Sequence, residues 1–573
     1  MTEPLLRIEE LTVSYRGRRG TLTAVRDVTL DVRPGEIVAL VGESGSGKST
    51  TAHAVARLLA PNAAIGGGRI LFGGRDLARL SERELRAVRG ARIGLVPQDP
   101  TVSLNPVQRI GDQVAEVLRL HGLATRRTAP AAAVEVLERA GLPDPRVRAR
   151  QYPHELSGGM RQRALIAIAV AAEPDLVVAD EPTSALDVTV QRRLLDHLEH
   201  LTGELGSAVL LVTHDLGVAA DRAQRIVVMS KGRVVEAGEA GRILRDPQDD
   251  HTRRLLRSAP SLTVATPRIT VTEPPPGASP EGSSGTPEKG TPGAGRPGDG
   301  SPEEDAAPLV SGENLVKDFP LPRAGKGAPR TVRAVDGVSL AVHPGRTLAL
   351  VGESGSGKST TARMLLRLVP PTSGRILARG QDVTRARGAA LRAFRRRAQL
   401  VYQNPYASLD PRFTVGEVIT EPLRAFRIGG RASRTARAKD LLDRVALPAS
   451  TLDRKPAELS GGQRQRVAIA RALALEPDLV VCDEPVSALD VSVQAQVLEL
   501  LAELQADTGV AYLFISHDLA VVRQIAHTVA VMKDGRVVEE GPVAGIFGSP
   551  SHDYTRDLLA AIPGRRARVL EET

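Results

Sequence analysis

The sequence is poor in the residues from which several kinds of site are built. It contains one cysteine, Cys482, no tryptophan and only 2% aromatic residues. A single cysteine excludes an intramolecular disulfide, a four-cysteine zinc site and a cysteine-ligated iron–sulfur cluster, and it fits a reducing compartment. Because Cys482 ends a short apolar run, we interpret it as a small buried strand residue rather than a reactive thiol.

Long apolar runs are also missing. A helix that spans a bilayer needs about 20 mainly apolar residues, whereas the most apolar stretch, residues 164–172 (ALIAIAVAA), has the length of a buried helix. The first residues, MTEPLLRIEE, lack the basic start and apolar centre of a secretory signal. We therefore expect a cytoplasmic chain that meets a membrane only through partner proteins.

The charge balance is positive, with 76 Lys and Arg against 67 Asp and Glu. Sites for single-stranded nucleic acid usually combine basic residues with stacking aromatic rings, and aromatic rings are scarce here. We interpret the excess as an arginine-rich surface and predict no nucleic-acid partner.

The 573 residues are enough for more than one domain. Five strings occur twice, in the same order and at a near-constant spacing, which predicts two homologous domains. The strings are VGESGSGKSTTA from Val41 and Val351, LSGG from Leu156 and Leu459, DEP from Asp180 and Asp483, SALDV from Ser184 and Ser487, and HDL from His214 and His517.

The predicted organisation has three parts. Residues 1–260 form the first domain, with a helical subdomain at about 99–156, and residues 309–573 form the second, with a helical subdomain at about 404–459. Residues 261–308 are rich in Pro, Gly, Ser and Glu and have few apolar side chains to offset the cost of ordering. They are predicted to be a flexible linker.

Short apolar runs alternate with helical patterns in each domain. Residues 36–41 (EIVALV), 176–179 and 208–212 are predicted buried strands, and residues 49–59 a helix. Continuous apolar strands that alternate with helices favour a mostly parallel α/β sheet. Between Gln98 and Leu156 the pattern has helical spacing only, which is why we expect a helical subdomain there.

Two glycine-rich segments match the pattern G-x-x-x-x-G-K-[ST], each between a predicted strand and a helix. Glycines let backbone N–H groups surround nucleotide phosphates at the positive end of a helix. Lys48 and Lys358 can then reach the outer phosphates, and the hydroxyl groups of Ser49 and Ser359 can bind Mg²⁺.

Two acids end an apolar strand in each domain, where carboxylates without a partner would cost desolvation. A metal ion and a water molecule to be activated would compensate that cost. Asp180 and Asp483 are therefore predicted to hold Mg²⁺, and Glu181 and Glu484 to act as general bases toward water.

Together these motifs resemble the ATP-binding subunits of ABC transporters, and the chain looks like two such subunits of the oligopeptide/dipeptide importer type fused together. The resemblance implies an α/β fold of two tandem P-loop ATPase domains, each with a mostly parallel sheet, an antiparallel β part and a helical subdomain. It implies ATP and Mg²⁺ as cofactors and ATP hydrolysis as the activity.

The resemblance also assigns roles to individual residues. Gln98 and Gln403 match the glutamines of the Q-loops and are expected to contact Mg²⁺ and to take part in catalysis. His214 and His517 are expected to contact the γ-phosphate. Ser184 and Ser487 match the first residue of the D-loops. The nucleotide-binding set is Tyr15 and Phe319 for adenine, Gly42, Ser44, Gly45, Gly47, Lys48, Ser49 and Thr50 with Gly352, Ser354, Gly355, Gly357, Lys358, Ser359 and Thr360 for the phosphates, and the signature residues Ser157, Gly158, Gly159, Ser460, Gly461 and Gly462.

In the family each signature motif completes the ATP site of the opposite domain. ATP bound at Lys48 is thus expected to contact Ser460, and ATP bound at Lys358 to contact Ser157. Since both bases, both histidines and both LSGG strings are intact, we predict two hydrolysis-competent sites.

Peripheral strings resemble the peptide-importer group. These are QDPTVSLNP from Gln98, QNPYASLDPR from Gln403, and the tail SPSHDYTRDLL; the first domain departs from the tail by Asp249 in place of His552 and His251 in place of Tyr554. The resemblance implies two membrane permease subunits, an extracytoplasmic solute-binding protein, no direct contact with the transported solute, and a peripheral position on the cytoplasmic face of the membrane.

Three alternatives carry related ATPase chemistry. A soluble twin ATPase acting on ribosomes usually has a charged helical linker, unlike the Pro/Gly-rich one here. A DNA-repair relative would need zinc modules that one cysteine cannot build. An exporter is a further alternative, because a fold does not fix the direction of transport. The group it resembles imports peptides, nickel chelates, glutathione and other small solutes, and a peptide is the first expectation on resemblance alone.

Overall fold

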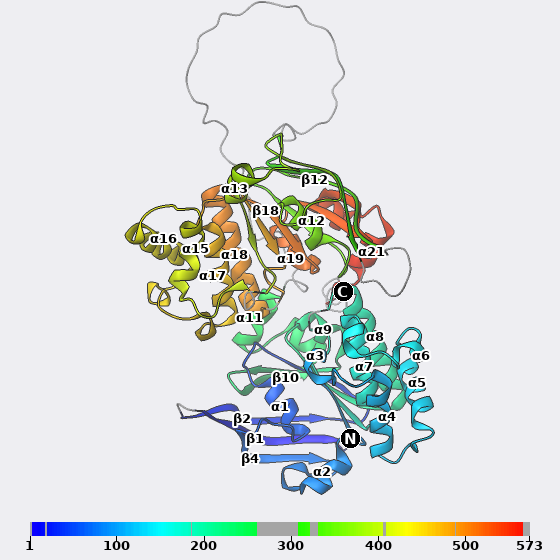
Figure 1. Ribbon diagram of the computed structural model, residues 1–573. Helices are drawn as coiled ribbons and strands as arrows, with labels where there is room; N and C mark the ends of the chain where they lie inside the picture. The colour runs from blue at the N-terminus through cyan, green and yellow to red at the C-terminus, as the bar shows by residue number, and fades with distance from the viewer. Residues whose placement is uncertain are drawn as a thin grey trace, which may run out of the picture.

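The computed structural model describes residues 3–17, 20–184, 186–259, 307–320, 331–404, 408–487 and 489–564. They form two halves of the same architecture, the N-terminal half up to residue 259 and the C-terminal half from residue 307 (Figure 1). The predicted linker lies outside the described residues except for residues 307 and 308, and so do residues 405–407 of the QNPYASLDPR string.

The elements of the N-terminal half are β1 (Leu6–Gly17), β2 (Gly20–Val32), β3 (Ile37–Val41), α1 (Lys48–Val55), β4 (Ala63–Phe72), β5 (Arg75–Asp76), η1 (Leu77–Arg79), α2 (Glu82–Val88), β6 (Ile93–Val96), α3 (Pro100–Ser103), α4 (Ile110–Leu120), α5 (Ala129–Arg139), α6 (Pro145–Arg148), η2 (Pro153–Glu155), α7 (Gly158–Val170), β7 (Leu176–Asp180), α8 (Val188–Leu205), β8 (Ala208–Thr213), α9 (Leu216–Arg222), β9 (Arg225–Ser230), β10 (Arg233–Glu239), α10 (Ala240–Arg245) and α11 (Asp250–Ser258).

Those of the C-terminal half are β11 (Val310–Pro320), β12 (Thr331–Val342), β13 (Thr347–Val351), α12 (Lys358–Leu365), β14 (Ser373–Ala378), β15 (Gln381–Asp382), α13 (Gly388–Arg397), β16 (Ala398–Val401), α15 (Val415–Ala425), α16 (Arg431–Arg444), η3 (Ala449–Thr451), η4 (Pro456–Glu458), α17 (Gly461–Leu473), β17 (Leu479–Asp483), α18 (Val491–Thr508), β18 (Ala511–Ser516), α19 (Leu519–Ile525), β19 (Thr528–Lys533), β20 (Arg536–Pro542), α20 (Val543–Gly548) and α21 (Asp553–Ala560).

Each half contains two sheets in its described part. The six-stranded sheet of the N-terminal half has the order β10-β9-β3-β8-β7-β6, parallel except for the pair β9/β10, and the four-stranded sheet β2-β1-β4-β5 is antiparallel. The C-terminal half repeats both orders. The prediction of an α/β fold with a mostly parallel sheet and an antiparallel part is therefore confirmed.

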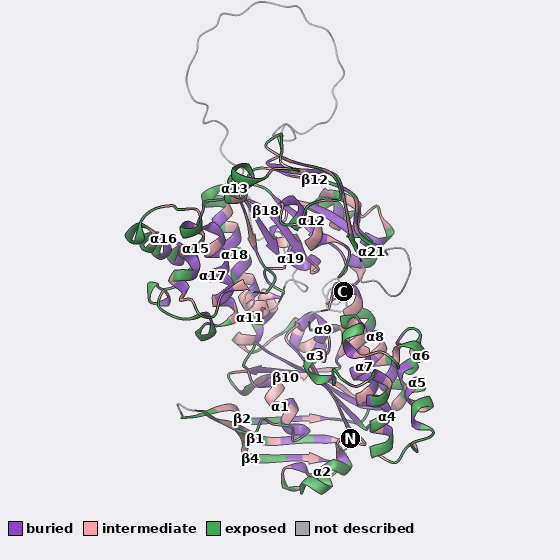
Figure 2. Ribbon diagram, viewed as in Figure 1, coloured by how far each residue is buried: buried purple, intermediate pink, exposed green. Residues whose placement is uncertain are grey.

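The parallel strands are buried on both faces (Figure 2). In β7, Val177 and Ala179 pack with α7 and α8, while Leu176 and Val178 face the core shared with α1 and the antiparallel sheet. Alternation of side chains along a strand produces these two cores from one continuous apolar run.

The predicted strands agree with β3, β7 and β8 to within a residue at each end. The predicted helix at residues 49–59 is too long, because α1 ends at Val55. Arg57 has a left-handed φ of 52°, and the N–H of Leu58 bonds to the carbonyl of His53, so the chain turns out of the helix there. In the described part of residues 99–156 only helices occur, as expected.

The two halves contact each other through their last helices. α11 contacts α18 of the C-terminal half, and α21 contacts α8 of the N-terminal half (Figure 1). Val188, at the start of α8, belongs to the apolar cluster that contains Tyr554 and Leu558. Within the described ranges, no helix combines the length and the apolar character that crossing a membrane requires.

Candidate functional site

A glycine-rich loop joins β3 to α1. Gly42 and Gly47 have φ values of 156° and 102°, and a Cβ atom would stand 2.2 Å from the Met229 carbonyl oxygen at Gly42 and 2.7 Å from that of Ala24 at Gly47. Side chains cannot be accommodated at either position, so the loop must keep these glycines. Gly352 and Gly357 are constrained in the same way.

A buried lysine lies inside each loop. Nζ of Lys48 donates to the carbonyl oxygens of Gly42 and Glu43, at 2.7 and 2.9 Å. Burial lowers the pKa of Lys48, although the nearby acids act in the opposite direction. Lys358 has the same bonds, to Gly352 and Glu353, and a lowered pKa for the same reason. A cation held at a helix N-terminus is suited to bind phosphate groups.

The predicted metal-binding aspartates lie beside the loop serines. Oγ of Ser49 donates to Asp180 at 2.9 Å, and the side chain of Asp180 is 2% exposed. The equivalent pair, Ser359 and Asp483, is 2.8 Å apart. Adjacent hydroxyl and carboxylate oxygens are ligands that Mg²⁺ accepts, together with water and phosphate oxygens, so these residues fit a magnesium ion.

The surroundings of the two aspartates differ between the halves. Nε2 of His53 is 3.3 Å from Asp180, whereas a guanidinium nitrogen of Arg363 is 3.8 Å from Asp483. Burial raises the pKa of Asp483 despite the hydrogen bond from Ser359 and the charge of Arg363.

The predicted base of each half is joined to the predicted glutamine and histidine. Nε2 of Gln98 donates to the carboxylate of Glu181 at 2.8 Å, and Nδ1 of His214 is 3.3 Å from the other carboxylate oxygen. Glu181 adopts a left-handed φ of 44°, a strained conformation for a residue with a side chain. The second half has the same three residue types, Gln403, Glu484 (φ 48°) and His517, but there both nitrogens lie near one oxygen, Oε2 of Glu484, at 2.8 and 3.2 Å.

Burial and neighbouring charges act in opposite directions on the pKa values of Glu181 and His214. Burial raises the pKa of Glu181, but the hydrogen bond and charge of His214 and the charge of Lys48 outweigh it, so the pKa lies below its usual value. Burial lowers the pKa of His214, and the bond and charge of Glu181 more than reverse this. The geometry therefore favours an ionised Glu181, the form that a general base requires.

The predicted adenine-binding residues occupy equivalent strand positions. Tyr15 pairs with Leu22 across β1 and β2, and Phe319 pairs with Val332 across β11 and β12. The Tyr15 hydroxyl lies 3.1 Å from Oγ1 of Thr50 in α1. The Phe319 ring is 39% exposed, with the Lys317 ammonium 5.2 Å from its centre. The Tyr15 ring is thus placed beside the helix that follows the phosphate loop of its half.

The signature segments begin the helices α7 and α17. Oγ of Ser157 accepts the N–H of Met160, and Ser460 and Gln463 form a reciprocal capping box. A Cβ at Gly159 would lie 2.8 Å from Val190, so the first turn of α7 is packed closely on α8. Gly158, Gly461 and Gly462 complete these helix starts.

Contacts between the halves join each phosphate loop to the segment after the other half's carboxylates. The backbone N–H of Ser44 donates to Asp490 at 2.9 Å, and that of Ser354 to Asp187 at 3.3 Å. Oγ1 of Thr189 lies 2.6 Å from Oε1 of Glu353. The sequence matched the D-loops to their family motif but gave no signal for these contacts, which depend on how the halves dock.

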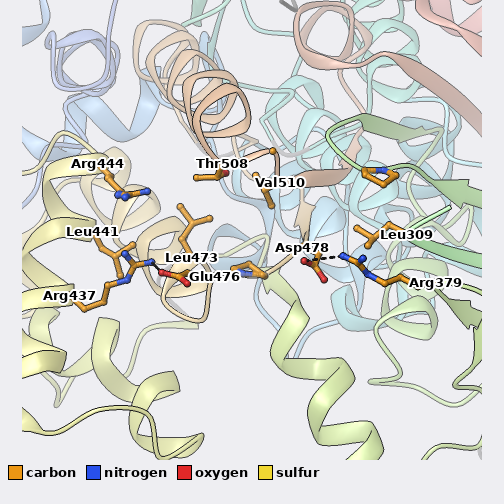
Figure 3. A pocket seen from close by; sticks show the side chains of 13 residues that line it. Leu309, Arg379, Arg437, Leu441, Arg444, Leu473, Glu476, Asp478, Thr508 and Val510 are labelled. Atoms are coloured by element: carbon orange, nitrogen blue, oxygen red, sulfur yellow. Dashed lines mark ion pairs between the residues drawn. The ribbon is translucent and has the colours of Figure 1, made fainter. Parts of the chain in front are cut away.

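A separate cavity of about 370 Å³ lies in the C-terminal half (Figure 3). Its lining includes Arg379, which pairs with Asp478 at 3.4 Å, and Arg437, which pairs with Glu476 at 3.0 Å. No lining residue belongs to the motifs described above, and these two arginines are neutralised by acids of the cavity wall. The cavity is therefore separate from the two phosphate-loop sites.

A duplicated phosphate loop, paired serine and aspartate, and a glutamate bonded to glutamine and histidine define an ATPase of the ATP-binding cassette class. The chain belongs to the ABC transporter family, whose model matches residues 25–184 and 335–487. A second model, described as the oligopeptide/dipeptide transporter C-terminal region, matches residues 538–570. The resemblance found in the sequence is confirmed, and the chain is an ATPase.

Relatives match almost the whole chain. The glutathione import ATP-binding protein GsiA of Escherichia coli O157:H7 is 44% identical, covering 98% of this chain and 89% of its own length. The oligopeptide transport ATP-binding protein OppD of Mycobacterium bovis is 44% identical, covering 98% of both chains. A solved dimeric ATP-binding cassette bound to ADP and Pi is 30% identical, with a TM-score of 0.38 over 41% of this chain and 98% of its own.

Proposed function

We propose that this chain is the ATP-hydrolysing subunit of an importer for peptides, attached to the cytoplasmic face of the membrane. Two observations support this. Relatives that match nearly the whole chain are named for the import of glutathione and for oligopeptide transport. The C-terminal residues match the region typical of oligopeptide and dipeptide transporters. Glutathione is itself a small peptide, so both names favour the same class of solute.

The two ATP sites are proposed to be shared between the halves. In the first, which we call the Lys48 site, ATP bound by the N-terminal loop is covered by Ser460, Gly461 and Gly462. In the Lys358 site, Ser157, Gly158 and Gly159 cover ATP bound by the C-terminal loop. The reciprocal bonds Ser44–Asp490 and Ser354–Asp187 carry this proposal, because they already place each loop against the opposite half.

The chemistry follows from the side chains of each site. Glu181 and Glu484 accept a proton from the attacking water, and His214 and His517 hold these carboxylates and face the γ-phosphate. Lys48 and Lys358 neutralise phosphate charge. Mg²⁺, held by Ser49 and Asp180 or by Ser359 and Asp483 with Gln98 or Gln403 nearby, supplies further charge neutralisation when bound.

Coupling to transport is proposed to pass through the glutamine loops. Gln98 bonds to the base, and its carbonyl oxygen accepts a bond from Ser184 at 3.3 Å. Directly after it, the side chains of Val102 and Val107 are 82% and 80% exposed. Such apolar side chains on a helical subdomain are suited to contact a protein partner, and we assign this surface to the two permease subunits.

The transported peptide would meet the permeases and an extracytoplasmic solute-binding protein, not this chain. ATP binding would close the two halves and hydrolysis would release them, so the switch is a nucleotide-biased equilibrium. Because both halves share one chain, closure is intramolecular and is favoured by a high effective concentration.

The proposal is tested by purifying the chain with its membrane partners and reconstituting the complex in liposomes. We expect ATP hydrolysis that rises when peptides and the solute-binding protein are present. Oligopeptides and glutathione should be compared in parallel. Absence of stimulation by any peptide, or co-sedimentation with ribosomes instead of membrane proteins, would contradict the proposed function.

A further inference from the structure

The last helix of the C-terminal half is anchored firmly beside the Lys358 site. The backbone N–H groups of Ser551 and His552 donate to the two carboxylate oxygens of Glu539, at 2.7 and 3.1 Å. Nδ1 of His552 then caps the start of α21 by accepting the N–H of Tyr554. These bonds fix the position from which the Tyr554 side chain leaves the helix.

The Tyr554 side chain reaches the phosphate loop of its own half. The residue is 6% exposed, and the Lys533 ammonium lies 4.7 Å from the ring centre. Its hydroxyl oxygen accepts the backbone N–H of Glu353 at 3.1 Å. Burial raises the pKa of Tyr554 to about 12, so the hydroxyl stays neutral at physiological pH.

Glu353 lies between this tyrosine and the other half. Its carbonyl oxygen accepts a bond from Lys358 at 2.7 Å, and its carboxylate lies 2.6 Å from the hydroxyl of Thr189. A path of hydrogen bonds therefore runs from α21 through the loop to the first turn of α8, where the single Thr189 proton is shared between Glu353 at 2.6 Å and Asp187 at 2.8 Å.

The N-terminal half lacks this path. α11 is anchored in the same way, since Glu236 accepts the N–H groups of Gln248 and Asp249 at 3.0 and 3.1 Å. His251 stands where the other half has Tyr554, and its Nε2 is buried without a hydrogen-bond partner. In the described part of the chain, no hydrogen bond links Glu43 to α11 or to Ser492, the counterpart of Thr189.

We propose that Tyr554 is a positioning residue of the Lys358 site, holding Glu353 for its contact with Thr189, and that this makes the Lys358 site bind ATP more tightly than the Lys48 site. The inference rests on the proposed sharing of each site between the halves. The two sites contain the same ATP-binding motifs, and their affinities for ATP differ because of Tyr554, which lies outside those motifs.

The test measures ATP binding by each half separately. The full-length chain carries Glu181→Gln and Glu484→Gln, so that no nucleotide is consumed, and a protease site in residues 261–308. A photoreactive ATP analogue that labels through its adenine ring is bound at increasing concentration, the chain is illuminated and cut, and the label in each half is counted. We expect half-maximal labelling of the C-terminal half at the lower concentration.

Two variants then test the path itself. Tyr554→Phe removes only the hydroxyl group and should raise the half-saturating concentration of the C-terminal half about 2- to 10-fold, the usual effect of one hydrogen bond. Thr189→Val, in the other half, should raise it by a similar factor. His251→Phe is the matched control and should change neither half. Thermal unfolding of each variant verifies that the chain is folded.

The outcomes separate the inference from the proposed function. If Tyr554→Phe leaves the C-terminal half unchanged, or shifts both halves equally, the role of Tyr554 is wrong. If Tyr554→Phe shifts the C-terminal half but Thr189→Val does not, the site is not shared between the halves as proposed. If Tyr554→Phe does not fold, Thr189→Val decides, because an unchanged C-terminal half would then overturn the path.

Discussion

The backbone N–H of Ser44 donates a 2.9 Å hydrogen bond to the carboxylate of Asp490, although the two residues belong to different halves. Asp490 lies just before the first turn of α18, and Val491 after it packs against the apolar cluster of the N-terminal half. The contact therefore connects the phosphate loop to the interface between the halves. ATP binding at the loop and docking of the halves should therefore be coupled.

Asp490→Ala should weaken ATP-driven closure. A hydrogen bond to a charged group contributes about 1.5–3 kcal/mol, so we expect about a 10- to 100-fold rise in the ATP concentration that half-saturates hydrolysis. The measurement is the rate of phosphate release against ATP concentration. Asp250→Ala is a control, because its carboxylate is 82% exposed and pairs with Arg253 in its own helix, α11. An unchanged ATP dependence for Asp490→Ala would contradict the coupling.

Both glutamates should act as bases, since Glu181 and Glu484 have the same glutamine and histidine partners. Loss of a general base costs about 10² to 10⁴ in rate. Glu181→Gln and Glu484→Gln should each remove at least the turnover of one site, and the double variant should fall to background. Wild-type turnover by Glu484→Gln would show that the Lys358 site is not competent.

The pH dependence of hydrolysis should depend on the histidines. With His214 present, the pKa of Glu181 is lowered, so the base stays ionised at pH values below its usual pKa and is protonated only at lower pH. His214→Ala with His517→Ala leaves burial as the dominant influence, which raises the pKa of the base. The acid limb of the residual rate should then move to higher pH.

The measurement is the rate of phosphate release from about pH 3.5 to 9, a range that includes the pH at which ionisation of the base limits catalysis. His200→Ala is the control, because His200 is 71% exposed on α8. An acid limb that stays in place, or one that moves to lower pH, would be inconsistent with the assigned coupling between the base and the histidine.

Local sequence patterns were sufficient to predict β3, β7 and β8 of the parallel sheet. Continuous apolar runs predict β7 and β8 because strands buried on both faces need no polar alternation. The end of α1 could not be predicted, since residues 56–59 keep a helical composition while Arg57 turns the backbone. At this turn the side chain of Arg89 donates to the carbonyl oxygens of Ala56 and Arg57, at 2.7 and 2.8 Å, and a local pattern does not encode such a contact with a distant segment.

The resemblance predicted sites shared between the halves through the signature segments, and the structure adds the bonds from each phosphate loop to Asp490 or Asp187 of the opposite half. Thr189 has no distinctive local pattern, and its contact with Glu353 depends on the docking of the halves. Tyr554 belongs to the tail string noted in the sequence, but that string does not indicate its contact with Glu353 in the same half. By contrast, the left-handed backbone at Glu181 lies inside a motif, yet its conformation follows from the bond of its N–H to Val212 in β8. Contacts between segments that are distant in the sequence could be identified only from the structure.

Cys482 should be unreactive in the folded chain. Its thiol is fully buried in β17, and burial raises the pKa of Cys482 to about 12, with the charge of Asp483 acting in the same direction. Because the thiolate is the nucleophile, iodoacetamide at neutral pH should not label the native protein, while the unfolded chain should take up one equivalent. Mass spectrometry of both states makes the measurement. Cys482→Ala should cost only about 1 kcal/mol, since Ala179 occupies the same strand position in the N-terminal half. Rapid labelling of the native chain would mean that β17 is open to solvent beside the catalytic carboxylates.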